Sequence, residues 1–562
     1  MKRKVYCCDV TRDLYEEYYK RQNGGEIPVF VRRRFQHGLG SILGGFFRRL
    51  ALPFLKHSKQ MLLNMVKTGM EVADDVMEGA LFKEAAKILV PSGIKRTILE
   101  LGSQSRSGAR RVKRRKNARD IFAQDMAFIH DDSCECTKSE LDLFSVPPTQ
   151  TSMEQGSWVE YHPLTTVTEG SPIEFDISGT GEDYIDFANT MLYVKAKVTA
   201  NDGTNLAADA AVGPVNLFLH SLFSQVDISL NGTLITASTN TYPYRAMLET
   251  LLTYGEDAKR SQLTTSLFYK DRAGRMNSVD FAEDGDTNDG LVKRRAFVRE
   301  SRTLDMMGRL HADIFFQDRY MLNEVGVKIK LVRSKDSFCL MGAASKVKIM
   351  HASLFVRKVK LTPSVFLAHA KTLERGSAKY PIRRVVCKSF TIPQNHMDVS
   401  HEKLFSGQLP TRIVIGLVDN RAYNGDLTRN PFNFEHFNLN EIALYLDGQQ
   451  QHAVRPIQPN YEQGHYIRAY SSLFAGTGKL CKDEGLFISR DDFANGYALY
   501  AFDLTADLGE DDHFSLLRQG SVRLALKFAA VLPATVTVVA YAEFENVVEV
   551  DRDRNVIFDF GV

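Results

Sequence analysis

The sequence lacks several features that would assign it to a familiar class. None of its 562 positions falls in a run of eighteen apolar residues, the length that a membrane-spanning helix needs. Trp158 is the only tryptophan, which argues against a glycan-binding surface rich in exposed aromatic side chains. The seven cysteines are odd in number and too sparse for a disulfide scaffold, and the first residues show no apolar signal segment. We therefore expect an intracellular protein that is not secreted.

Motifs for common chemistry are missing as well. The sequence contains no Gly-x-Ser-x-Gly nucleophile elbow and no His-Glu-x-x-His zinc motif. Asp284, Asp286 and Asn288 begin like a calcium-binding loop, but Asp289 stands where that loop requires glycine. We expect no enzymatic activity, no catalytic residues, no metal site and no cofactor.

Charge is divided unevenly along a chain whose formal net charge is only +3. Residues 1–120 hold 26 lysines and arginines against 12 aspartates and glutamates, whereas the remainder holds 45 against 56. A basic arm on a mildly acidic body predicts a polyanionic partner for the arm. The predicted DNA contacts are the basic residues of its densest part: Arg106, Arg110, Arg111, Lys113, Arg114, Arg115, Lys116 and Arg119. Such a run binds phosphates without reading base sequence, and a nuclear-import signal or a solubilising tail is the alternative.

A second pattern in the arm is amphipathic. Phe46, Phe47, Leu50, Phe54 and Leu55 recur at the spacing of one helical face, with basic residues off that face. This spacing fits a helix lying on a membrane surface, and equally a helix packed against the body or a partner.

The rest of the chain repeats itself. Three pairs of segments match in the same order: 228–232 with 444–448, 326–332 with 521–527, and 352–359 with 541–548. The first pair is an alternating strand that ends in the Asn-Gly or Asp-Gly of a tight hairpin turn. The repeat predicts two copies of one β-unit. The spacing of the matches places extra residues in the first copy, which we expect to form an inserted charged loop at 258–299.

Local signals complete the predicted architecture. Residues 192–198 alternate strictly and should bury Leu192, Val194, Ala196 and Val198. Thr362 followed by Pro363 predicts the start of a helix between the copies. Short strands with long variable connections are typical of jelly rolls. The predicted fold is mainly β, with two tandem eight-stranded jelly-roll β-sandwiches behind a helical or disordered basic arm. The predicted segments are the arm at 1–120, a linker at 121–155, the first jelly roll at 156–361, a helix and linker at 362–380, and the second jelly roll at 381–562.

Several long strings carry a family resemblance. They are LFSGQLPTRIVIGLVDN at 404–420, NPFNF at 430–434, LYLDGQ at 444–449, TPSVFLAHAK at 362–371, KYPIRR at 379–384 and EVDRDRN at 549–555. Over this region the chain resembles the major capsid protein of Polinton/Maverick elements and adintoviruses, which are frequently integrated in animal genomes. The string HGLGSILGGFF at 37–47 resembles small core or membrane-lytic proteins of adenovirus-like viruses. Residues 42–45 also resemble the site cut by adenovirus-type proteases, which implies cleavage after Gly45; a glycine-rich hinge is the alternative.

The resemblance implies a structural role. A hexon-like double jelly roll would form homotrimers that act as pseudo-hexameric capsomers of an icosahedral shell. The implied partners are further copies of the chain, a minor or penton capsid protein, the DNA genome, and a membrane through the amphipathic helix. The implied location is the virion capsid, reached from the host nucleus or cytoplasm during assembly. From the residues alone, a cellular tandem β-sandwich that binds glycans or proteins stays open, as does a nucleic-acid-binding protein with accessory sandwiches.

Overall fold

The computed structural model describes residues 149–558 except 168–169, 180, 282–285, 448, 451–454 and 509–512. All the elements below belong to one compact unit, Gln150–Val562. The predictions for residues 1–148 lie outside the described residues.

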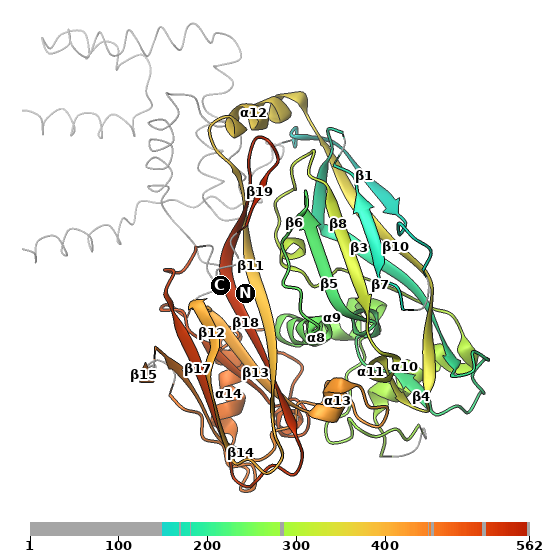
Figure 1. The fold of residues 1–562 in the computed structure, drawn as a ribbon, viewed down its shortest axis with the longest axis vertical. Coiled ribbons are helices and arrows are strands. Elements are labelled where there is room, and N and C mark those ends of the chain that lie inside the picture. Colours follow the sequence, from blue (N-terminus) through green and yellow to red (C-terminus); the bar gives the residue numbers. More distant parts are fainter. Residues whose placement is uncertain are drawn as a thin grey trace, which may run out of the picture. The chain divides into compact units, whose positions relative to one another are not determined.

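The first half of this unit is a sandwich of two antiparallel sheets (Figure 1). One sheet has the order β1 (Met153–Tyr161), β10 (Ser345–Leu361), β3 (Tyr184–Ala200) and β7 (Leu304–Gly308). The other has the order β2 (Ile173–Ile177), β8 (Val327–Arg333), β5 (Phe223–Leu230) and β6 (Thr233–Leu234). The predicted alternation is confirmed, because Leu192, Val194, Ala196 and Val198 of β3 are all buried between the sheets.

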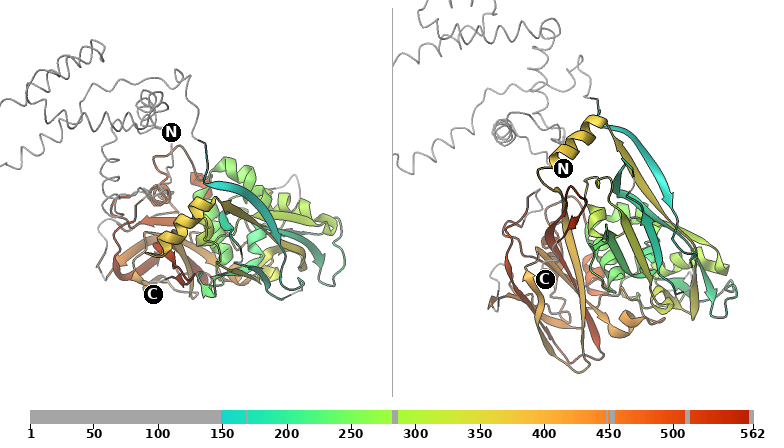
Figure 2. Two further views of the ribbon diagram at one scale, coloured as in Figure 1. Left: turned by 90° about the horizontal axis from the view of Figure 1, so that it is seen from above. Right: turned by 45° about the horizontal axis from the view of Figure 1, so that its top comes forward.

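The second half repeats this arrangement. One sheet has the order β11 (Ala378–Ile392), β18 (Val536–Val550), β13 (Arg412–Asp419) and β16 (Leu499–Asp503), with β19 (Val556–Ile557) paired to β18. The other has the order β12 (Asp398–Gln408), β17 (Gln519–Phe528), β14 (Leu439–Leu446) and β15 (Gln449–Gln450). Figures 1 and 2 show the two sandwiches side by side.

Both halves have the same topology. A short pair, β4 (Val212–Pro214) and β9 (Leu340–Gly342), stands outside the two main sheets. When the eight strands of the two main sheets are numbered in chain order, one sheet has the order 1-8-3-6 and the other has the order 2-7-4-5, and this holds in both halves. This is the strand order of an eight-stranded jelly roll. The prediction of two tandem jelly rolls is therefore confirmed.

The three sequence matches fall on equivalent strands. They coincide with the fourth strands β5 and β14, the seventh strands β8 and β17, and the eighth strands β10 and β18. In the third pair, however, the aligned residues point to opposite faces. Leu354 is buried in the core, whereas its match Glu543 pairs with Arg412 at 3.2 Å, away from the core. A bulge explains this shift, because β10 has one extra residue, Met350, relative to β3.

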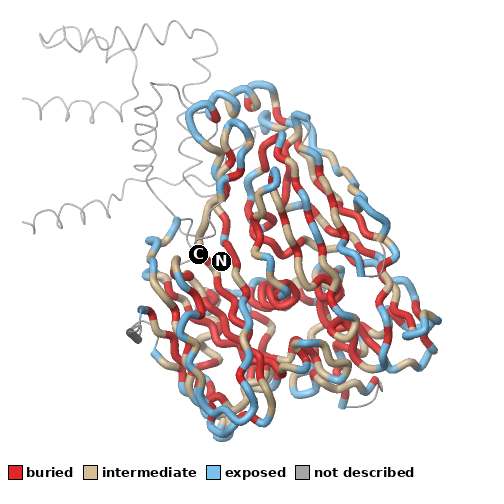
Figure 3. Tube along the Cα trace, viewed as in Figure 1, coloured by how far each residue is buried: buried red, intermediate tan, exposed pale blue. Residues whose placement is uncertain are grey.

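The connections contain most of the helices. The predicted helix between the sandwiches is confirmed as α12 (Pro363–Leu373), with Thr362 at its N-cap and proline in its first turn. The extra residues expected in the first copy do fall in the connection from β6 to β7, but the prediction that 258–299 forms a loop is wrong, because this segment contains helices. The connection from β6 to β7 contains α8 (Tyr242–Thr253), α9 (Glu256–Arg260), η3 (Gln262–Ser266) and α10 (Asp289–Val298). Its Arg294 is completely buried, and Figure 3 shows the buried residues of α8 next to those of the second sandwich.

Candidate assembly interface

The sequence-predicted site residues all precede the described region. The DNA contacts between Arg106 and Arg119, the helical face from Phe46 to Leu55 and the cleavage after Gly45 therefore stay predictions. Within the described residues, no helix is long and apolar enough to cross a membrane. The candidate interface consists of the contact between the two sandwiches and of the surfaces at equivalent positions that no part of the described chain covers.

Arg245 of α8 stands at the centre of the contact between the sandwiches. Its Nε donates to Glu249 Oε1 at 2.8 Å, and its Nη2 donates to Asp313 Oδ1 at 2.6 Å. Asp313 begins η5 (Asp313–Phe316), and the same Oδ1 accepts a hydrogen bond from the backbone N–H of Val385 in β11 at 3.0 Å. Thr241 donates to the Cys387 carbonyl at 2.9 Å. Helix α8 and η5 of the first sandwich are thereby fixed to the first strand of the second.

Burial and pairing set the protonation of this cluster. Burial raises the pKa of Asp313, and Arg245 opposes that rise. Burial also acts to raise the pKa of Glu249, but Arg245 and His311 outweigh it, so the pKa of Glu249 is lowered. The pKa of His220 is lowered well below its ordinary value, first by burial and then by His311, whose ring lies 4.6 Å away. Buried charges of this kind need their partners, so the network fixes one relative position of the elements that carry it.

A second buried cluster joins the long first-sandwich connection to the second sandwich. Asp271 Oδ1 accepts hydrogen bonds from Arg294 at 2.6 Å and from Asn288 at 2.9 Å. Its Oδ2 accepts from Asn430 at 3.0 Å, and its backbone carbonyl accepts from the Tyr497 hydroxyl at 2.8 Å. Asn430 and Tyr497 belong to the second sandwich, so one carboxylate ties both halves together.

The end of the chain makes a third connection. Arg554, beyond the last long strand of the second sandwich, donates from Nε to the Asn323 carbonyl at 2.8 Å. Asn231, at the hairpin turn of the first sandwich, donates to the Arg554 carbonyl at 2.9 Å. Three separate sets of contacts therefore hold the sandwiches in one arrangement.

Equivalent sheet faces of the two sandwiches are covered differently. Strand β13 has no exposed residue, because its sheet lies between its own partner sheet and elements packed on the outer side. The equivalent strand β3 alternates between buried and accessible residues, so its outer face is open. That face carries Trp158, which is 54% exposed, together with Tyr193 and Phe355, whose ring centroids are 6.1 Å apart.

The connection that follows the sixth strand also differs between the halves. It spans 309–326 in the first sandwich and 504–518 in the second. In the first sandwich it contains η5, which contacts β11. In the second it exposes Phe514, Leu516 and Leu517 by 51%, 88% and 68%. Only spatial equivalence identifies this surface, because no sequence motif marks it.

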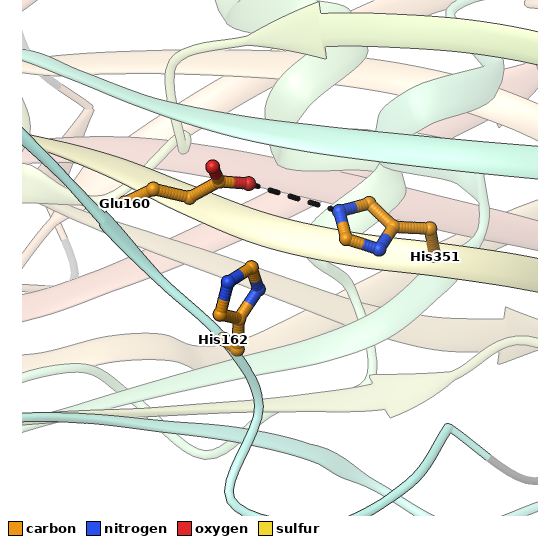
Figure 4. Close-up of side chains that lie close together, drawn as sticks. All are labelled: Glu160, His162 and His351. Carbon is orange, nitrogen blue, oxygen red and sulfur yellow. Dashed lines mark ion pairs between the residues drawn. The ribbon is translucent and has the colours of Figure 1, made fainter.

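A cluster of ligand-type side chains lies on the open face (Figure 4). Glu160 of β1, His162 just after it, and His351 of β10 bring their potential ligand atoms within 4.8 Å of one another. His351 Nε2 is 3.8 Å from Glu160 Oε1. No sequence motif marks this cluster, because nearly the whole first sandwich separates His162 from His351 along the chain.

Among the comparisons with known proteins, the one with solved structures bears on the fold. No family model matches the chain. The chain is 25% identical over 436 residues to the uncharacterized protein F54H12.2 of Caenorhabditis elegans, covering 74% of this chain and 99% of that protein. Among solved structures it is similar to a chain in the cryo-EM structure of the Sputnik virophage. That match has a TM-score of 0.51 and 12% identity, and covers 76% of this chain and 93% of that one.

Two further solved structures are similar at lower scores. The PBCV-1 virus capsid matches with a TM-score of 0.47 and 12% identity, over 74% of this chain and 99% of that one. The mavirus major capsid protein matches with a TM-score of 0.42 and 13% identity, over 81% of this chain and 97% of that one. The strand order described above and the match to the Sputnik chain together support a fold of the viral double jelly-roll type.

Proposed function

We propose that the chain is a structural major capsid protein. Three copies form a pseudo-hexameric capsomer of an icosahedral shell, and the basic arm contacts the genome or a membrane on the inside. The similarity of the fold to a chain of the Sputnik virophage supports this proposal, as does the sequence resemblance to capsid proteins of Polinton/Maverick elements and adintoviruses.

The observation that carries the proposal concerns the contact between the two sandwiches. This contact forms once within the chain, and the surfaces that could form it a second time are left exposed. The first sandwich presents α8 and η5 to the outer face of a second-sandwich sheet, so the contact joins two different surfaces. Contacts of this head-to-tail type repeat from unit to unit and close into a ring when the rotation permits. The second sandwich has the equivalent presenting surface at 504–518, and the first has the equivalent open sheet face.

When the same contact forms between two copies, the exposed connection of one second sandwich packs against the open sheet face of the next first sandwich. Leu516 and Leu517 of one copy then lie against the face around Trp158 of the next. Six sandwiches close the ring, and because each chain supplies two, the ring contains three chains. Burial of these exposed apolar side chains supplies a driving force of about 25 cal/mol per Å² of apolar area.

The test is the oligomeric state of the full-length chain, measured by sedimentation velocity. We expect trimers for the wild type and monomers for the double variant Leu516→Asp/Leu517→Asp. The control is Val531→Asp, which places one aspartate on a 57% exposed apolar residue outside the proposed contact and should leave the trimer intact. A wild-type chain that stays monomeric at high concentration would contradict the proposal and favour a cellular interaction module.

A further inference from the structure

We propose that Glu160, His162 and His351 form a binding site for a transition-metal ion of the zinc class. Two imidazole nitrogens and one carboxylate oxygen are a donor set that zinc prefers, and three protein ligands leave a fourth position for water or another group. The three ligand atoms already lie within 4.8 Å of one another.

Local backbone geometry brings these side chains to one face. Glu160 and His162 are two positions apart along an extended segment, so both point to the outer side of the sheet. Strand β10 pairs antiparallel with β1, with Phe355 opposite Glu160. Before the bulge at Met350, the core residues of β10 are Val347 and Ile349; after it, they are Ala352 and Leu354. The bulge thus turns His351, which the regular alternation would place in the core, to the outer face.

The distances need only a small adjustment. Ligand atoms around a tetrahedral zinc ion lie about 3.3 Å apart, given metal–ligand distances of about 2.0–2.1 Å. His351 Nε2 and Glu160 Oε1 are 3.8 Å apart, and their side chains are 39% and 40% exposed, which leaves them free to rotate. The charged group opposite His351 on the next strand is Lys195, whose Nζ lies 5.7 Å from the Tyr193 ring centroid. Lys195 is itself opposite Asp305.

A bound ion would cross-link β1 to β10 where β1 ends. Strand β1 is the edge strand of its sheet and pairs with β10 alone among the described strands. The last paired residue of β1 is Tyr161, so the ligand His162 lies just beyond the hydrogen-bonded ladder. The ion would therefore hold the end of this edge strand against its neighbour. The site lies within one chain and does not depend on the proposed trimer, although it shares the open sheet face with the proposed contact.

The test is zinc binding by the metal-free full-length chain, measured by calorimetric titration and by metal content after dialysis. We expect His162→Ala/His351→Ala to bind one equivalent less than the wild type. Glu160→Gln should raise the dissociation constant for that zinc ion by more than about tenfold. His396→Ala is the matched control, because His396 is an exposed histidine outside the cluster, and it should bind like the wild type. Any zinc held by cysteines is bound equally by the wild type and the three variants, so it does not affect the difference in zinc content between them.

Equal zinc content in the wild type and the double histidine variant would overturn the site. Urea unfolding of each variant checks that it is folded, and a Co²⁺ absorption difference lacking a sulfur charge-transfer band would support nitrogen and oxygen ligands. If the chain trimerises but loses no zinc on substitution, the metal site fails and the capsomer proposal stands. If it binds zinc through these residues but stays monomeric, the reverse holds.

Discussion

At the scale of single residues, the molecule is held together by buried polar groups whose partners are distant in sequence. Asp271 meets Arg294 within the long connection, but it meets Asn430 and Tyr497 only because the second sandwich folds against the first. No sequence pattern marks these contacts of Asp271, because the spacing of residue types along a sequence describes only neighbours within one helix or strand. For the same reason no sequence pattern marks the Glu160–His162–His351 cluster, and the prediction from the sequence was that the chain has no metal site.

Replacement of Arg294 tests the importance of this cluster. Arg294→Ala leaves the Asp271 carboxylate buried without its cation, so we expect the free energy of unfolding to fall by about 3–5 kcal/mol. The measurement is urea denaturation of the full-length chain. Arg302→Ala is the matched control, because Arg302 is 66% exposed and lies 3.4 Å from Glu300. Its loss should change stability by less than about 0.5 kcal/mol, and equal effects of the two variants would contradict the assigned role.

At the scale of strands and helices, the sequence predicted what local alternation determines. The repeated strands, the hairpin at 228–232 and the helix after Thr362 were all predictable, because each depends on period-two alternation, turn residues or a cap. The inward-facing residues of β10 could not be predicted from alternation alone, because the bulge at Met350 shifts the alternation and a second irregularity between Phe355 and Arg357 shifts it again. The helices at 242–298 were missed because tertiary contacts, such as those of Arg294, stabilise that segment more than its own amphipathic pattern does.

The hairpin turn between β5 and β6 offers a test at this scale. Asn231 and Gly232 have φ values of 45° and 85°, as a two-residue turn of type I′ requires. Gly232→Ala adds a Cβ that meets no atom within 4 Å, so its cost is purely conformational, about 1–2 kcal/mol in urea denaturation. Gly376→Ala is the matched control, because its Cβ also enters open space and its φ is not in the left-handed region. That variant should be neutral or more stable by about 0.4–1 kcal/mol, since alanine restricts the unfolded chain.

At the scale of the whole molecule, the proposed function uses one kind of contact twice, once within the chain and once between copies. Within the chain, the contact is built from charged clusters that fix the position of α8 and η5 on β11. In the proposed trimer, the equivalent surfaces are the exposed leucines at 516–517 and the open sheet with Trp158. The proposed contact between copies is thus more apolar than the contact within the chain. This difference fits an association of folded chains that is driven by burial of apolar surface.

The basic arm should act independently of this assembly. Deleting 102–120 removes all eight predicted DNA contacts, so we expect the chain to trimerise normally while losing its salt-dependent affinity for duplex DNA. If all eight residues neutralise phosphates, the logarithm of the wild-type binding constant should fall with the logarithm of salt concentration with a slope of about −7. Fluorescence anisotropy with duplexes of unrelated sequence measures this slope, and a variant with an uncharged Gly/Ser segment of equal length controls for chain length. Retained DNA affinity in that variant would contradict the assignment, whereas lost trimerisation would show that the arm contributes to the capsomer itself.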